Sequence, residues 1–169
     1  EHGIRIDKAG MAIAAQQSEE EALELCQKIS TIIKRTCVPD ASYTKDDTAL
    51  NLSSSQQLQD YFYNQLSIKP YVNKDSGKPT ADETALVRIA NQGYAEALLI
   101  LRVRKLMKQR STFLDTSQLD SDDRMRCQYN PVGTKFGRIS SSENIFGTGT
   151  NLQNIPHEVL TYFLADEGY

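Results

Sequence analysis

Residues 8–37 of the chain read KAGMAIAAQQSEEEALELCQKISTIIKRTC, the longest stretch with a helical pattern. Apolar residues recur there every three or four positions, which is the period of an amphipathic α-helix. These apolar positions are Ala22, Leu25, Cys26, Ile29, Ile32 and Ile33. Acidic residues precede basic residues along the stretch, in the order that the helix dipole favours. We expect one helix here, with Asp7 as its N-cap and with Pro39 and Asp40 closing it.

Three more helices are expected further along the chain. They cover about residues 54–66, 80–93 and 94–114. The first two begin at capping boxes, Ser54–Gln57 and Thr80–Glu83, in which a hydroxyl residue is followed three positions later by Gln or Glu. Polar, turn-rich loops separate these helices, so neighbouring helices are expected to run antiparallel.

Two short stretches, residues 1–7 and 124–129, alternate between polar and apolar side chains and are predicted strands. Residues 130–156 are rich in Gly, Ser, Thr and Asn and have no helical period. Residues 157–165 are expected to form a short apolar helix or turn. The predicted fold class is mainly α (α+β): long antiparallel helices followed by a small β or irregular C-terminal part.

Composition excludes several classes of protein. The chain has 169 residues, of which 39% are hydrophobic and 24% charged, so it has enough apolar residues for a core and is not expected to be disordered. No apolar run approaches the roughly 18 residues of a membrane-spanning helix. The first residues do not contain a basic stretch followed by an apolar one, so no secretory leader is expected. The three cysteines have no CxxC spacing, which argues against a disulfide framework or zinc site and favours a reducing compartment.

Charge is unevenly distributed, although the net charge is only −3. Residues 100–138 carry 9 Lys and Arg against 4 Asp and Glu, a net +5, whereas both flanking stretches are net −4. Five of these cations lie between residues 102 and 110 on a predicted helix, where Arg104 and Lys108 share one face. Such a row can reach the phosphates of a nucleic acid; a solvated helix face is the alternative explanation.

Two blocks near the C-terminus carry the most specific signal. Residues 134–142 read TKFGRISSS, and residues 151–156 read NLQNIP. Together and in this order they resemble the signature of the family A DNA polymerases, Thr-x-Thr-Gly-Arg-(Leu/Ile)-Ser-Ser followed by Asn-Leu-Gln-Asn-Ile-Pro. Weaker similarity extends over nearly the whole chain, including residues 51–58 and 104–113. The resemblance implies an entry strand (residues 1–7), a helical thumb subdomain (residues 8–114) and the start of the palm (residues 115–169).

The resemblance also implies roles for individual residues in gripping a primer–template duplex along its minor groove without reading sequence. Arg138 would donate to minor-groove acceptors near the primer terminus, and Arg104 and Lys108 would contact the duplex from their helix. The amides of Asn151, Gln153 and Asn154 would contact bases and backbone, with loop capping as the alternative. Lesser backbone contacts are expected from Thr134, Asn51, Ser53, Lys78 and Thr80.

This sequence departs from the family pattern at two points. Phe136 replaces the second threonine of the signature, and residues 144–150 form an insertion that resembles a phage-type variant. We expect the insertion to be a flexible loop without chemistry of its own. The aspartates that hold two magnesium ions in the complete polymerase are expected to lie outside this chain, and Asp166 and Glu167 are not expected to replace them. We therefore expect no cofactor and no catalysis from this chain alone.

The implied partners are primer–template duplex DNA and the remaining palm and fingers of the polymerase, in the same or a separate chain. No membrane contact is expected, and the implied location is the cytoplasm of a bacterial cell or of a phage-infected host. One alternative is a chain of a naturally split polymerase. Another is a non-catalytic helical module that binds a protein partner. An independent enzyme has no nucleophile–base pair or metal cluster in the sequence to support it.

Overall fold

The computed structural model describes residues 2–46, 48–135, 137–166 and 168. The chain divides into two compact units. Residues 18–107 form the first, here called the helical unit; residues 1–17 and 108–169 form the second, here called the sheet unit. The boundaries fall inside the two longest helices, α1 (Lys8–Ile33) and α4 (Glu96–Phe113). Phe136 and Glu167, discussed above, lie outside the described residues.

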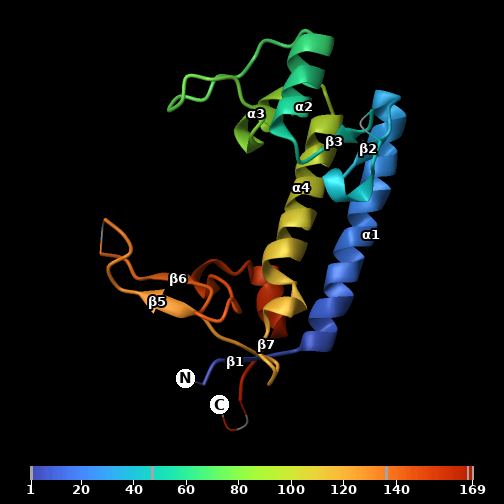
Figure 1. The fold of residues 1–169 in the computed structure, drawn as a ribbon. Coiled ribbons are helices and arrows are strands. Elements are labelled where there is room, and N and C mark those ends of the chain that lie inside the picture. The colour runs from blue at the N-terminus through green and yellow to red at the C-terminus, as the bar shows by residue number, and fades with distance from the viewer. Residues whose placement is uncertain (1, 47, 136, 167, 169) are drawn as a thin grey trace. The chain divides into compact units, whose positions relative to one another are not determined.

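The helical unit is built on antiparallel parts of α1 and α4 (Figure 1). Its other elements are β2 (Cys37–Val38), a 3-10 turn (Ala41–Tyr43), β3 (Leu50–Asn51), α2 (Ser55–Gln59), a π-helical segment (Asp60–Gln65) and α3 (Glu83–Ala90). Strands β2 and β3 pair in parallel. Its core is apolar and closed to solvent. Core side chains include those of Ala22, Ile29, Leu58, Phe62, Leu86, Ile100 and Val103.

Helix ends in this unit follow local capping chemistry, with corrections to the sequence predictions. Helix α1 ends at Ile33, earlier than expected, because Lys34 has φ +57°. Ser54 caps α2 as predicted and accepts from the Gln57 N–H. The Gln57 side chain returns to the Asn51 N–H and not to Ser54 itself. The second capping box is wrong: Asp82, not Thr80, accepts from the first turn of α3.

The sheet unit contains the remaining strands. A three-stranded antiparallel sheet has the order β4 (Arg124–Met125), β1 (Ile4–Ile6), β7 (Phe163–Leu164). A separate antiparallel hairpin pairs β5 (Gln128–Asn130) with β6 (Ser140–Ser142). Short 3-10 turns cover Thr116–Gln118, Leu152–Asn154 and His157–Tyr162. The core of the unit consists of Ile6, Met11, Leu114, Leu119, Met125 and Val159.

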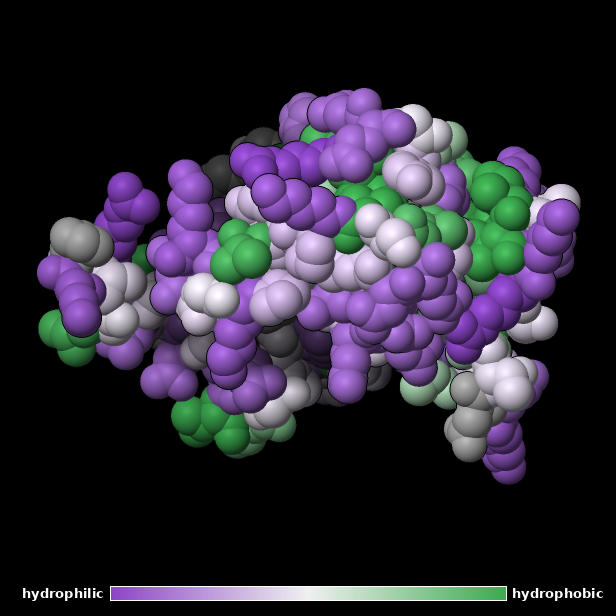
Figure 2. All heavy atoms as spheres, turned by 90° about the horizontal axis from the view of Figure 1, so that it is seen from above, coloured by the Kyte–Doolittle hydropathy of each residue, from purple (hydrophilic) through white to green (hydrophobic). Residues whose placement is uncertain are grey.

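The predictions for this unit are confirmed in part, and the helix or turn expected over residues 157–165 ends at Tyr162 because Phe163–Leu164 form β7. Asp7 caps α1 by accepting from the Gly10 N–H, and residues 4–6 form the entry strand. The single strand predicted over residues 124–129 is wrong, because β4 and β5 belong to different sheets. In the part of the chain that the structure describes, no helix is both long and apolar enough to cross a membrane. Hydrophilic residues cover most of the face drawn in Figure 2, and hydrophobic residues form separate patches on it.

Candidate nucleic-acid interface

The first signature block closes the β5–β6 hairpin. At the end of the hairpin, the Thr134 hydroxyl accepts from the Arg138 N–H and donates to the Arg138 carbonyl, both at 2.8 Å. Gly137 has φ +71°, which allows the tight turn between them. The Arg138 side chain is exposed, and among the described residues its guanidinium has no hydrogen-bond or ion-pair partner. The hairpin therefore fixes the backbone of Arg138 and leaves five N–H donors available.

The second signature block is joined to the first by Asn151. Its side-chain oxygen accepts from the Ser141 hydroxyl at 2.6 Å and from the Gln153 N–H at 3.1 Å, capping the turn Leu152–Asn154. This is the capping alternative for Asn151, and it uses the carbonyl end of that amide. The side chains of Gln153 and Asn154 are exposed. The structure thus joins the two blocks through the Ser141–Asn151 hydrogen bond and leaves Arg138, Gln153 and Asn154 exposed.

Residues 144–150 form a turn closed by hydrogen bonds. The Thr148 hydroxyl donates to Asp120 at 2.6 Å and accepts from the Asn144 amide at 2.7 Å. The Asn144 N–H donates to the Thr148 carbonyl at 2.8 Å, and the Gly149 N–H donates to the Gln118 carbonyl at 2.7 Å. The insertion is therefore attached at its C-terminal end to residues 118–120.

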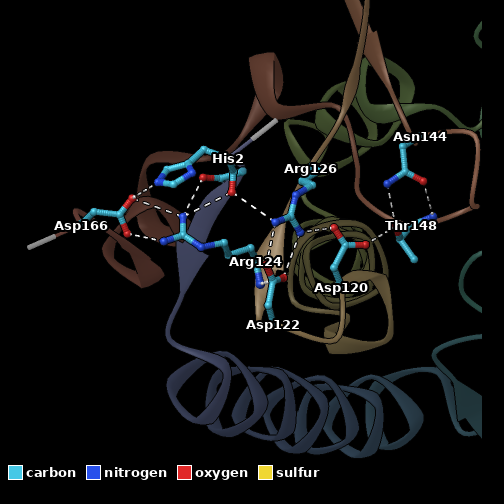
Figure 3. Close-up of polar contacts among 9 residues, drawn as sticks. His2, Asp120, Asp122, Arg124, Arg126, Asn144, Thr148 and Asp166 are labelled. Atoms are coloured by element: carbon cyan, nitrogen blue, oxygen red, sulfur yellow. Dashed lines mark hydrogen bonds and ion pairs between the residues drawn. The ribbon is translucent and has the colours of Figure 1, made fainter.

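An arginine–carboxylate network continues from Asp120 (Figure 3). Arg126 binds Asp120 at 2.6 Å and binds Asp122 with both ends of its guanidinium, at 2.9 and 2.6 Å. Arg124 forms a second bidentate pair with Asp166, at 3.2 and 2.5 Å. Bidentate pairs of this kind fix geometry as well as charge. Sequence reasoning missed the network, although the acids at 120–123 next to the arginines at 124 and 126 were a signal for it.

These contacts change the acidity of the carboxyl groups. Hydrogen bonds from Arg126 lower the pKa of Asp122 to about 2. The Thr148 hydroxyl, followed by Arg126, lowers the pKa of Asp120, and Arg124 lowers the pKa of Asp166. Each carboxylate is therefore held in its charged form at neutral pH. Asp166 is occupied by Arg124, and the described residues bring together no three His, Cys, Asp or Glu side chains that fit a metal ion.

We expect the sheet unit to lose stability in acid because of these lowered pKa values. A carboxyl whose pKa is lower in the folded than in the unfolded state stabilises the fold above its unfolded pKa, near 3.8, and ceases to do so as the pH falls through its folded pKa, about 2 for Asp122. Asp122→Asn should unfold at a lower temperature at pH 7 and show a smaller further decrease between about pH 4 and about pH 2. Thermal unfolding followed by circular dichroism measures both; an unchanged acid dependence contradicts the assignment.

Arg104 is half-buried in the helical unit. Its guanidinium donates to the carbonyls of Leu52 at 2.7 Å, Ala81 at 2.8 Å and Ser53 at 3.3 Å. Desolvation by burial lowers its pKa from the usual range. These contacts use donors on all three guanidinium nitrogens, so in this structure Arg104 joins two loops of its own unit.

The other residues of the helical unit that are expected to contact DNA are Asn51, Ser53, Lys78 and Thr80. Asn51 accepts from both the N–H and the hydroxyl of Ser53, at 2.9 and 2.8 Å. The Thr80 carbonyl accepts from the Tyr63 hydroxyl. Lys78 is exposed, within a turn closed by the bond from the Asn73 N–H to the Lys78 carbonyl. Arg104 thus joins Leu52 and Ser53 to Ala81, while Lys78 lies in a separate turn.

Comparison with known proteins gives consistent matches. Residues 16–167 match the sequence model of DNA polymerase family A. DNA polymerase I of Pseudomonas aeruginosa is 26% identical over 98% of this chain, and that of Chloroflexus aurantiacus is 28% identical over 99%. The chain spans 18% and 17% of the lengths of these two relatives.

A solved structure shows the same fold. It is the POL domain of Pol1 from M. smegmatis, in complex with DNA primer-template and dNTP. Its TM-score with this chain is 0.78 at 23% identity, and the match covers 99% of this chain and 27% of the other.

Proposed function

Because the chain belongs to DNA polymerase family A, we propose that it is the part of a DNA polymerase that grips the primer–template duplex. In this proposal residues 8–114 are the thumb, residues 115–169 begin the palm, and the insertion at 144–150 marks a phage-type enzyme. The grip is on the minor groove and does not select sequence. The proposed location is the cytoplasm of a bacterial cell or of a phage-infected host.

One observation carries the proposal: Arg138 is presented by a closed hairpin with its guanidinium unpaired among the described residues. A planar cation with fixed backbone geometry can donate to purine N3 and pyrimidine O2, the acceptors that the minor groove offers at every base pair. The amides of Gln153 and Asn154 are also exposed, and they can donate or accept and so tolerate either base-pair orientation. Exposed Lys108 and Lys78 add contacts to phosphate, which is a purely electrostatic contribution.

Chemistry in this proposal belongs to the assembled polymerase. Nucleotidyl transfer uses two divalent metal ions, magnesium by the resemblance, held by carboxylates. In this proposal those carboxylates belong to the remaining palm of the assembled polymerase. The chain's own contribution is to position the duplex, and the remaining palm and fingers are its partners.

The test is DNA binding by the 169-residue chain, measured by anisotropy of a labelled primer–template duplex. We expect sequence-independent binding that weakens steeply between about 50 and about 200 mM salt. Arg138→Ala should weaken it by about tenfold, the loss typical of one arginine–base contact. Arg88→Ala is the matched control, because it removes the same charge from an exposed site on α3.

Two results contradict the proposal. One is a folded chain that binds no duplex at either salt concentration. The other is an Arg138→Ala variant that binds as well as the Arg88→Ala control. Protein capture without DNA binding would instead support the interaction-module alternative.

A further inference from the structure

The tip of the insertion exposes two large apolar side chains. Ile145 is 81% exposed and Phe146 is 83% exposed. Leaving two adjacent hydrophobic side chains in water lowers solubility and contributes nothing to the folded core. A pair this exposed, on an ordered turn, indicates a surface that another molecule covers.

The turn is built to hold that tip in place. Asn144 accepts from the Phe146 N–H at 2.9 Å, and it also bonds Thr148 on the other side of the tip. Thr148 donates to Asp120, which is itself bound by Arg126 (Figure 3). Hydrogen bonds therefore connect the tip through Asn144, Thr148 and Asp120 to Arg126. A preformed tip loses little conformational freedom on binding.

Its surroundings point to nucleic acid. Ile145 and Phe146 line a pocket of about 1210 Å³ together with Gln128 and Tyr129 of β5. Strand β5 pairs with β6, which begins two residues after Arg138. Tyr129 is 57% exposed, so two aromatic rings are available there. Between residues 127 and 156 the only charged side chains are Lys135, Arg138 and Glu143, a net +1. The pocket is also lined by Asp120 and Arg126, whose opposite charges offset each other. An aromatic surface without excess negative charge is suited to bases next to a phosphate backbone.

We propose that Ile145 and Phe146 form an apolar wedge that packs against a base step of the bound duplex from its minor groove. Apolar side chains inserted in this way partly unstack the step they enter. The inference rests on the proposed function, since it takes the duplex held by Arg138 as the occupant. The residues between the two signature blocks, Glu143–Thr150, then act as a second contact to the same DNA.

The experiment places 2-aminopurine, whose fluorescence rises on unstacking, at successive positions of the duplex. We expect a rise at one or two neighbouring positions when the chain binds, and loss of that rise in Ile145→Ala/Phe146→Ala. Affinity for the duplex should fall by about fivefold or more, the lower end of what a base–aromatic contact contributes. Thr148→Val removes the hydroxyl that bonds Asp120 but keeps Ile145 and Phe146. It should reduce the fluorescence rise in part. Leu98→Ala is the control, an exposed apolar side chain on α4.

Outcomes separate this inference from the proposed function. If Arg138→Ala weakens binding and the double variant does not, the wedge is overturned and the grip remains. If the unsubstituted chain binds no duplex, both are overturned. The wedge is also overturned if Ile145→Ala/Phe146→Ala weakens the binding of single-stranded DNA more than the binding of duplex DNA. The wedge is likewise overturned if the chain forms a dimer and the double variant is monomeric, because the tip then contacts a second copy of the chain.

Discussion

Arg104→Ala is expected to lower the free energy of unfolding of the helical unit by about 3 kcal/mol, because carbonyls lose charged donors in a partly desolvated site. The three acceptors belong to Leu52, Ser53 and Ala81. Two of them come from residues that are themselves buried, so water replaces the lost donors poorly. Urea unfolding followed by circular dichroism measures the change.

Two variants separate this structural role from a charge effect. Arg104→Lys keeps the charge but cannot reach three carbonyls with one ammonium group, so it should lose most of the same stability. Lys108→Ala removes an exposed cation from the same helix and should change stability by less than about 0.5 kcal/mol. Equal stability of Arg104→Ala and Lys108→Ala would show that the carbonyl contacts contribute nothing.

Gly149→Ala is expected to destabilise the sheet unit by about 3 kcal/mol or more, through a steric clash combined with backbone strain. Gly149 has φ +84°, and a Cβ added there would lie 1.7 Å from the Arg126 carbonyl oxygen. The backbone cannot easily shift, because the Gly149 N–H is bonded to the Gln118 carbonyl at 2.7 Å. The variant must therefore release the insertion from residues 118–120 or distort β4.

Gly147→Ala is the matched control for that clash. Gly147 has φ +76°, but an added Cβ would meet nothing within 4 Å. It should cost only the strain of a left-handed alanine, about 1 kcal/mol. Thermal unfolding and hydrogen exchange of the Gly149 N–H distinguish the two positions. Similar losses from both variants would mean that the close approach to Arg126 is not a constraint.

Local sequence was enough for much of the secondary structure and for the family. Apolar spacing predicts α1 and α4, and Asp7 and Ser54 cap their helices through side chains only three residues from the N–H groups they bind. The two signature blocks indicate the family because their residue types and order are unusual in combination. These features depend on neighbours within a few positions, so a linear pattern contains them.

Contacts between distant residues needed the folded chain. Strand β1 pairs with β4 and β7, more than 110 residues further along, and the local pattern does not say which strands pair. Arg104 resembles a solvent-facing cation in sequence, yet it bonds carbonyls 23 to 52 residues away. Thr148 and Asp120 meet across 28 residues to hold the insertion. Periodicity and capping record the preferences of the backbone over a few residues, whereas these partners are chosen by burial and by the need to satisfy polar groups once the core has closed.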